Sequence, residues 1–405
     1  MKRPFEELFS DTAAKLKVSV IRELLKLTQK PEVISFAGGL PNPDAFPVQQ
    51  IHKICPDVIN NRSALQYGTT EGVPELRDAL KERMARKNVK CELENIQITS
   101  GSQQALDILG RILLNPNDLI LTTCPTYLGA IQAFGFRDPR YELVEMDEHS
   151  VIVEDLEARL EDIHKRGDDK RLKFFYITPT FHNPAGVTIP EKRRKRIIDL
   201  CNAYDVLIIE DDPYGELRYR GKDEPLLKSL DTEDRVIYLS TFSKILVPGF
   251  RIAWMVAPEE LVKKFVMAKQ AVDLCTTTFT QYIGAEYLRR GYVDEHIKKI
   301  KEIYGRKMQI MLRSMEEYFP EGAQYAEPDG GMFVWVRLPE HVNTIDMFHK
   351  AIEQNVAYVV GSAFYPNGKG TNTMRLNFTH PSDDKIEEGI KRLGNVLHQE
   401  LSKKP

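Results

Sequence analysis

Runs of consecutive apolar residues recur between about residues 70 and 300, and amphipathic segments separate them. The segments 102–114 and 190–204 have apolar residues at helical spacing. Strands that are apolar at successive positions are buried on both faces, which is typical of a largely parallel sheet with helices on each side. This part of the chain is therefore predicted to be an α/β domain. The runs that predict its strands are 95–99, 119–123, 173–177, 206–210, 236–240 and 252–256.

The pattern changes after about residue 300, where the order of elements predicts a smaller α+β domain. The elements expected there are a long helix over 294–318, strands over 332–336, 356–360 and 373–378, and a final helix over 382–402.

The N-terminal region has a pattern of its own. Residues 5–30 are predicted to be helical, with Ile21, Leu24, Leu25 and Leu27 on one face. The Gly- and Pro-rich segment 34–43 is expected to be an irregular arm.

We divide the chain into three parts on this basis. Residues 1–47 are expected to form an N-terminal helix and arm that pack with the small domain and the active site. Residues 48–300 are expected to form the large, cofactor-binding domain, and residues 301–405 the C-terminal small domain.

The composition limits the partners of the chain. The 56 Lys and Arg residues are interspersed with 59 Asp and Glu residues, and the net charge of −3 argues against a nucleic-acid partner. No stretch approaches the roughly 18 apolar residues of a membrane helix, and the N-terminus lacks the apolar region of a secretory signal. The five cysteines lie far apart without a C-x-x-C motif, so they are expected to be small apolar residues in the reducing cytoplasm rather than metal ligands.

One lysine is chemically distinctive. Lys244 follows the strand 236–240, Thr241 and Ser243 surround it, and Arg251 lies seven positions later. A lysine can form an imine with an aldehyde, while hydroxyls and an arginine can neutralise a phosphate. Pyridoxal 5′-phosphate (PLP) needs both, so this segment is a candidate site for that cofactor. Considered alone, this motif also fits an ordinary lysine that lies in solvent at the end of a strand.

Four further motifs also follow predicted strands. In a doubly wound sheet, ligands bind outside the carboxyl ends of the strands, so we expect the motifs to converge. A helix start can bind an anion, an aromatic ring can stack on a flat cofactor, and a buried carboxylate can keep a pyridine nitrogen protonated. Each motif alone also fits an N-cap, a core tyrosine, a turn or an acidic helix start. The residues concerned are Ser102 and Gln103, Tyr127, Asn183, and Asp211 with Tyr214.

Together these motifs resemble the fold-type I PLP enzymes of the aminotransferase class I and II family. The arm Phe36–Pro43 and the segments Gly101–Asp107 and Ala130–Phe134 are similar to those of its 2-aminoadipate, kynurenine and aromatic aminotransferase subgroup. The resemblance covers nearly the whole chain, from about Val18 to the final helix. It implies a large domain with a mostly parallel seven-stranded sheet between helices, and a smaller α+β domain.

The resemblance also implies roles for individual residues. Lys244 would form the imine with PLP and move the proton of the substrate α-carbon, and Asp211 would pair with the pyridine nitrogen. Asn183 and Tyr214 would bind the ring oxygen, and Tyr127 would stack on the ring. The phosphate would be held by Ser102, Gln103, Thr241, Ser243, Arg251 and, across the interface of a homodimer, Tyr67.

On the substrate side, Arg375 would bind the α-carboxylate with both arms of its guanidinium, near Asn183 and Gly39. Arg22 would select acidic amino donors from a helix before the arm, and a surface arginine paired locally is its alternative. The contribution of His182 to the pocket stays open.

The implied activity is transfer of an amino group from 2-aminoadipate, an aromatic amino acid or a related donor to a 2-oxo acid such as 2-oxoglutarate. A ping-pong mechanism through aldimine and ketimine would carry it. A decarboxylase, racemase or lyase on the same fold is an alternative, because the choice of bond depends on the substrate pose. A PLP-sensing regulatory module is a further alternative, but the arm begins by residue 33, and we expect no room for the DNA-binding domain it needs.

Overall fold

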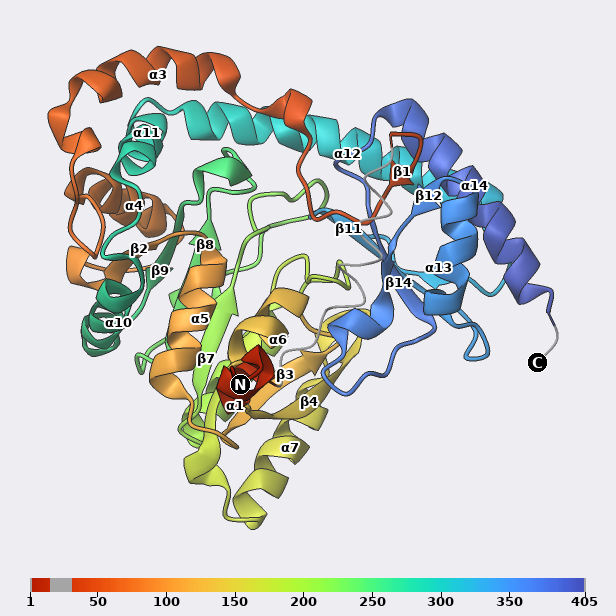
Figure 1. The fold of residues 1–405 in the computed structure, drawn as a ribbon, viewed down its shortest axis with the longest axis horizontal. Coiled ribbons are helices and arrows are strands. Elements are labelled where there is room, and N and C mark those ends of the chain that lie inside the picture. The colour runs from red at the N-terminus through yellow and green to blue at the C-terminus, as the bar shows by residue number, and fades with distance from the viewer. Residues whose placement is uncertain (1, 15–30, 404–405) are drawn as a thin grey trace.

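The computed structural model describes residues 2–14 and 31–403, and two sheets dominate its architecture (Figure 1). One is an eight-stranded mixed sheet, and the other is a four-stranded antiparallel sheet. A two-stranded parallel pair joins the N-terminal arm to the smaller part.

The large sheet is mostly parallel, as the apolar runs predict. Parallel pairing connects β8, β7, β6, β3 and β4, whereas β9 and β5 pair antiparallel with their neighbours. The sheet has eight strands rather than the expected seven, because the two-residue strand β5 pairs with the end of β4. The order is β2 (Ile96–Thr99), β9 (Ala253–Val256), β8 (Val236–Thr241), β7 (Leu207–Asp211), β6 (Leu172–Ile177), β3 (Leu119–Cys124), β4 (Arg140–Asp147) and β5 (Ser150–Val151).

Helices cover both faces of this sheet because successive side chains of each strand point to opposite sides. In β6, Phe174 and Tyr176 pack in one apolar cluster, while Phe175 and Ile177 pack in the other. The first cluster includes side chains of α5 (Ser102–Leu113), α6 (Leu128–Gly135) and α10 (Glu259–Asp273). The second includes side chains of α7 (Val153–Lys165) and α8 (Glu191–Ala203).

A third cluster closes the β2–β9 edge, where Trp254 and Val256 are buried. Its helices are α3 (Val48–Asn60), α4 (Pro74–Arg86) and α11 (Thr278–Arg289). The one-turn helix α9 (Leu227–Leu230) lies between β7 and β8 in the chain.

The smaller part has the predicted α+β composition. Its sheet has the order β10 (Gln324–Tyr325), β11 (Phe333–Arg337), β14 (Thr373–Asn377) and β13 (Val359–Val360). The helices α12 (Tyr292–Tyr318), α13 (Thr344–Glu353) and α14 (Asp383–Leu401) pack on the same core. The strand expected over 356–360 is divided into β12 (Val356–Ala357) and β13. Because α12 contributes side chains to both this core and that of the β2–β9 edge, the division at residue 300 stays a prediction.

The N-terminal arm packs on this smaller part. Strand β1 (Ile34–Ser35) pairs in parallel with β12, and the carbonyl oxygen of Phe36 accepts a 2.9 Å hydrogen bond from the backbone N–H of Asn377. The ring of Phe36 is fully buried.

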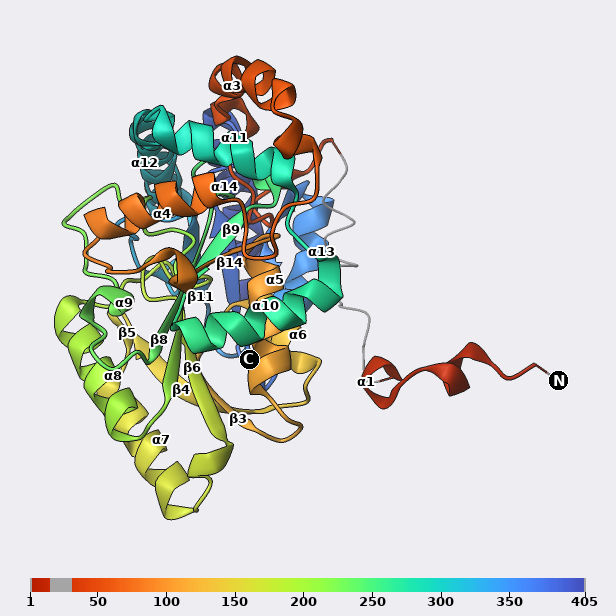
Figure 2. The same cartoon turned by 90° about the vertical axis from the view of Figure 1, so that its left-hand side faces the viewer.

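The continuous helix predicted over 5–30 is wrong for its first part. Residues Phe5–Leu8 form a 3₁₀ turn and α1 is the short helix Asp11–Ala14, because Phe9 between them has an extended backbone. This segment lies away from the body of the protein (Figure 2). Residues 15–30 lie outside the described residues. Within the described ranges, no helix combines the length and the apolar character needed to cross a bilayer.

Candidate active site

A cavity of about 730 Å³ opens where the parallel strands β3, β6, β7 and β8 end. Residues from the small sheet and the N-terminal arm complete its wall, so the cavity lies between the two parts of the molecule. Twelve of the residues predicted from the sequence line it: Gly39, Ser102, Gln103, Tyr127, Asn183, Asp211, Tyr214, Thr241, Ser243, Lys244, Arg251 and Arg375.

Lys244 lies just beyond β8, and its Nζ donates a 2.8 Å hydrogen bond to the carbonyl oxygen of Gly39 in the arm. Burial is the main cause that lowers the pKa of the Lys244 amine to about 8, and the positive charges of Arg375 and Arg251 contribute to the same shift. A lowered pKa increases the fraction of neutral amine near pH 7, and the neutral form is the nucleophile and the base.

Asp211 is the last residue of β7 and is only 3% exposed. Its Oδ2 accepts a 2.7 Å hydrogen bond from the hydroxyl of Tyr176 on the neighbouring strand β6. Its Oδ1 is buried and has no hydrogen-bond partner among the described residues. Burial raises the pKa of the Asp211 carboxyl to about 7, and the nearby charge of Asp212 also raises it, whereas the Tyr176 bond lowers it.

The unpartnered Oδ1 provides a test of whether PLP fits the cavity. Asp211 lines the cavity, so a ligand in it can supply the missing donor. The protonated pyridine nitrogen of PLP is such a donor, and it also needs a carboxylate to stay protonated. The residues present therefore fit this cofactor.

A chain of hydrogen bonds links the middle of the cavity to the small sheet. Asn183 donates from Nδ2 to the hydroxyl of Tyr214 at 3.1 Å, and its Oδ1 accepts from Nη1 of Arg375 at 2.8 Å. Nη2 of Arg375 donates to the carbonyl oxygen of Ala37 at 3.0 Å. Since the Tyr214 hydroxyl accepts from Asn183, its own proton is left to donate to a ligand oxygen.

Arg375 lies on the central strand β14 of the small sheet. Its guanidinium carbon is 4.1 Å from the ring centre of Phe333 and 5.0 Å from that of Phe364, so aromatic faces hold it in place. Burial lowers the pKa of Arg375 to about 10, and the side chain remains cationic at neutral pH. Its Nε is buried without a partner among the described residues, which leaves a donor for a substrate carboxylate.

The start of α5 supplies an anion site at the other end of the cavity. Gly101 has a φ of 80°, and a Cβ there would overlap the guanidinium of Arg251, so only glycine fits this position. The Ser102 Oγ is buried and unpartnered among the described residues. The first N–H groups of an α-helix have no partner within the helix, so they can also bind an anion. Thr241 and Ser243 add hydroxyls, whose oxygens are 2.9 Å apart.

Gln103 and Tyr127 form one wall together. The Gln103 side chain donates to the carbonyl oxygen of Gly129 at 2.7 Å, so its backbone N–H rather than its amide faces a ligand. A Cβ at Gly129 would lie 2.5 Å from the Tyr127 ring, so the absence of a side chain there lets the ring lie against the turn. An aromatic face in this place can stack on a flat ring.

Two residues singled out in the sequence, Tyr67 and His182, do not line this cavity in the described structure, and a third lies outside the described residues. Tyr67 is 80% exposed and does not line the cavity of its own chain. Arg22 lies outside the described residues. His182 is 1% exposed; its Nε2 is 3.0 Å from the Thr123 hydroxyl, and its Nδ1 accepts from the Ala185 N–H at 3.2 Å.

These contacts indicate that His182 has a structural role. Burial lowers its pKa to about 3, so the ring is neutral. The ring joins the end of β3, which precedes Tyr127, to the loop that carries Asn183, and both Tyr127 and Asn183 line the cavity.

Sequence reasoning missed Tyr176, which orients Asp211. The signal was a hydroxyl in an otherwise apolar strand, two positions along the same face as Phe174. Among the described residues no cluster of His, Cys, Asp and Glu side chains is suited to hold a metal ion.

Comparisons with known proteins show which family the chain resembles. The family profile described as "Aminotransferase class I and II" matches residues 31–393. The chain is 49% identical to the aromatic-amino-acid aminotransferase 1 of Thermococcus litoralis, over 98% of this chain and 96% of that protein. It superimposes with a TM-score of 0.95 on the kynurenine aminotransferase of Pyrococcus horikoshii, at 46% identity over 98% of this chain and 99% of the other. The TM-score is 0.90 against the α-aminoadipate aminotransferase LysN of Thermus thermophilus, solved with N-(5′-phosphopyridoxyl)-L-leucine, at 36% identity over 99% and 100% of the two chains.

Proposed function

Because this chain belongs to the aminotransferase class I and II family, we propose that its preferred amino donors are aromatic amino acids and that 2-oxoglutarate is its acceptor. The chain is a PLP-dependent aminotransferase that moves amino groups from amino acids to 2-oxo acids, and its named relatives do not favour the decarboxylase or regulatory alternatives. The substrate class is the part that needs an argument from the cavity.

The observation that carries the donor class is the apolar wall beside Arg375. Leu128, Val359 and Phe364 line the cavity, and of these Val359 and Phe364 are neighbours of Arg375. Among the described lining residues, the only cations are Lys244, Arg251 and Arg375. Arg251 would be occupied by the phosphate and Arg375 by the α-carboxylate, so an acidic side chain would find no further cation among the described residues, whereas an aromatic ring would find apolar contacts. The remaining candidate cation for an acidic donor is Arg22, which lies outside the described residues.

When bound, PLP supplies an aldehyde that takes up an amino group and a ring that accepts electrons. We assign to Asp211 the retention of the proton on the ring nitrogen, and to Asn183 and Tyr214 the orientation of the ring through its oxygen. Lys244 moves the proton from the substrate α-carbon, because its amine is neutral for a substantial part of the time at a pKa of about 8. Arg375 holds the substrate carboxylate, and Ser102, Thr241, Ser243 and Arg251 hold the phosphate.

Steady-state kinetics with 2-oxoglutarate and a panel of donors tests the donor class. We expect kcat/KM for phenylalanine, tyrosine, tryptophan and kynurenine to exceed that for 2-aminoadipate by about tenfold or more, the value of one or two well-placed apolar contacts. The Leu128→Ala variant should lose activity toward aromatic donors only. Equal or greater kcat/KM for 2-aminoadipate in the wild type would contradict the proposal.

We also propose a homodimer with shared active sites, in the reducing cytoplasm. Leu65, Tyr67, Met267 and Leu274 are among the large apolar side chains exposed on the described surface, and Tyr67 does not line the cavity of its own chain. A C2 dimer would bury them and bring Tyr67 to the phosphate site of the other subunit. All five cysteines are free thiols, which suits a reducing compartment.

Complementation tests the shared site. Lys244→Ala and Tyr67→Ala homodimers should both have low activity, and mixed dimers should recover one intact site. Sedimentation should show a dimer at micromolar concentration. An active monomer, or mixed dimers without recovered activity, would refute the shared site and leave the donor class unaffected.

A further inference from the structure

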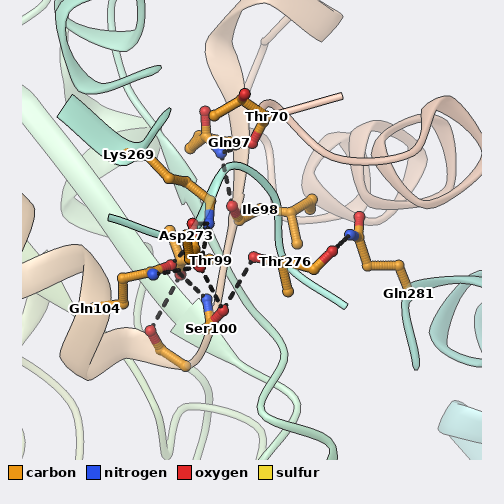
Figure 3. A network of polar contacts seen from close by, with 11 residues as sticks. Thr70, Gln97, Ile98, Thr99, Ser100, Gln104, Lys269, Asp273, Thr276 and Gln281 are labelled. Carbon is orange, nitrogen blue, oxygen red and sulfur yellow. Dashed lines mark hydrogen bonds and ion pairs between the residues drawn. The ribbon is translucent and has the colours of Figure 1, made fainter. Parts of the chain in front are cut away.

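A polar network that is fully buried at Lys269 and 25% exposed at Asp273 lies behind the turn that begins α5 (Figure 3). At its centre is Lys269 of α10, whose side chain is 0% exposed. Its Nζ is 2.7 Å and 2.9 Å from the two carboxylate oxygens of Asp273, and it donates to Oε1 of Gln104 at 3.0 Å. Gln104 in turn donates from Nε2 to Asp273 at 2.6 Å.

The network binds the turn before α5 through both the backbone and the side chain of Ser100. The backbone N–H of Ser100 donates to Oε1 of Gln104 at 2.8 Å, and the Ser100 hydroxyl donates to Asp273 at 3.1 Å. Gly101 and Ser102 follow directly, and Ser102 is the first residue of α5. The N–H groups that would bind a phosphate are therefore attached to α10 through Ser100 and Gln104.

The same network continues toward Tyr67. The Ser100 hydroxyl is 3.3 Å from the hydroxyl of Thr276. Two residues farther on, the hydroxyl of Thr278 contacts the carbonyl oxygens of Ala64 at 3.0 Å and Gln66 at 2.8 Å. A Cβ at Gly68 would lie 2.7 Å from the Thr278 methyl group, so the loop that carries Tyr67 rests directly on this segment.

Gln281 adds a second attachment to the same region. Its Nε2 donates to the carbonyl oxygen of Thr276 at 2.7 Å, and its Oε1 accepts from the backbone N–H of Val73 at 2.9 Å. The segment 276–281 thus lies between the α5 turn and the loop 64–73, with hydrogen bonds to both.

A fully buried lysine is a costly way to fill space. Replacing a buried ion pair by apolar residues of similar volume is often neutral or stabilising, so an ion pair here is better explained by the geometry it imposes than by stability. The partners of Lys269 and Asp273 are the residues beside Gly101, and neither charge lines the cavity.

We propose that Lys269 is a positioning residue: through Asp273, Gln104 and Ser100 it holds the phosphate-binding turn of its own subunit in line with the loop that offers Tyr67 to the partner. The inference rests on the proposed function, because it assigns the α5 turn and Tyr67 to two phosphate sites of one dimer. Each subunit then sets the geometry of half of each site.

The test is the affinity of the cofactor-free dimer for PLP, followed by absorbance, and for inorganic phosphate, followed by competition with PLP. The Lys269→Met variant keeps the length of the side chain and removes the charge. Loss of a residue that orients a binding group typically costs about ten- to a hundredfold in affinity. We expect the Kd values of both PLP and phosphate to rise by about that factor.

Lys307→Met is the matched control. Lys307 is also a buried lysine, 3.3 Å from Asp383, and it does not line the cavity. The Lys307→Met variant should lose about as much thermal stability as Lys269→Met, but its Kd values for PLP and for phosphate should not change. Equal loss of affinity in the two variants, or unchanged affinity in Lys269→Met, would overturn the proposal. If Lys269→Met does not fold, Gln104→Met, which buries no unpaired charge, is judged by the same two outcomes.

Hydrogen exchange tests the link to Tyr67. In Lys269→Met, amides of residues 64–72 and 99–104 should exchange faster, while those of α8 stay unchanged. Faster exchange in 99–104 alone would refute the link between the two phosphate sites. If the wild type itself failed to bind PLP or to transaminate any donor, the proposed function would fail instead, so the two failures are distinguishable.

Discussion

Asp211→Asn is predicted to stabilise the cofactor-free protein and to inactivate the enzyme. The structural reason is that the Asp211 carboxyl is buried, with one oxygen bound to Tyr176 and the other unpartnered among the described residues. Asparagine occupies nearly the same volume and carries no charge. The substitution therefore removes the energetic cost of a buried carboxylate and also removes the partner of the PLP ring nitrogen.

The pKa of Asp211 sets the magnitude and the sign of the expected change in the free energy of unfolding. Its value in the folded protein is raised to about 7, against 3.8 for an unperturbed carboxyl. Between these two pH values the folded state binds more protons than the unfolded state, so this group lowers the stability as the pH rises from about 4 to about 7. A shift of roughly three pKa units, at 1.36 kcal/mol each, corresponds to at most about 4 kcal/mol.

The assay is urea unfolding of cofactor-free wild type and Asp211→Asn at pH 4.5 and pH 8.5. At pH 4.5 the carboxyl is neutral in the folded protein but largely ionised in the unfolded chain, so the two proteins should differ by only about 1 kcal/mol. At pH 8.5 the variant should have the larger free energy of unfolding, by up to about 4 kcal/mol. With PLP added, the variant should still bind the cofactor through its phosphate contacts but should lose at least about a hundredfold in kcat.

A difference in stability that is the same at both pH values would refute this reasoning, because it would show that Asp211 does not ionise across this range in the folded protein. Unchanged kcat would separately rule out its role at the ring nitrogen. Asp212→Asn is the matched control for kcat, because Asp212 is buried beside Asp211 but does not line the cavity. Its kcat should fall far less than that of Asp211→Asn.

Three further predictions concern single residues. Borohydride reduction of the PLP-loaded enzyme should abolish its visible absorbance and leave the pyridoxyl label on Lys244 in a peptide digest; a label on another lysine would refute the assignment. Tyr176→Phe removes a hydrogen bond to a charged group, worth about 1.5–3 kcal/mol, so it should raise the pKa of Asp211 by roughly one to two units. The acidic limb of the pH profile of PLP binding should then move to higher pH, and an unmoved profile would contradict that role. Arg22→Ala should lower kcat/KM for glutamate and 2-aminoadipate by about ten- to a hundredfold and leave phenylalanine unaffected, because only an acidic side chain would gain a charge-assisted contact; equal losses would indicate a structural arginine.

The strand-end residues could be placed from the sequence because parallel strands bring their carboxyl ends to one edge. Asp211 and Lys244 each follow an apolar run, so their positions in the chain also give their positions in space. Arg375 could be placed only through the family resemblance, since it lies on the other sheet and its partner Asn183 is 192 residues away in the chain.

Other contacts could not be predicted because local pattern does not encode them. Tyr176 lies in an apolar run and has the spacing of a core residue, and only the pairing of β6 with β7 puts its hydroxyl on Asp211. The contact of Lys269 could not be predicted for the same reason, since its partner Gln104 is 165 residues away in the chain. The helix predicted over 5–30 is wrong for residues 5–14 because the apolar spacing at residues 21–27 does not determine the backbone of the residues before it.

The arm itself competes with ligands for the cations of the cavity. The carbonyl oxygens of Ala37 and Gly39 accept hydrogen bonds from Arg375 and Lys244, and both carbonyls are neutral. A carboxylate at Arg375 exchanges a neutral acceptor for a charged one, which is a stronger bond for the guanidinium but removes a tether from the arm. Substrate affinity thus includes the free-energy cost of loosening residues 37–39. The rate at which a protease cleaves the arm should therefore increase with the fraction of cavities that hold substrate.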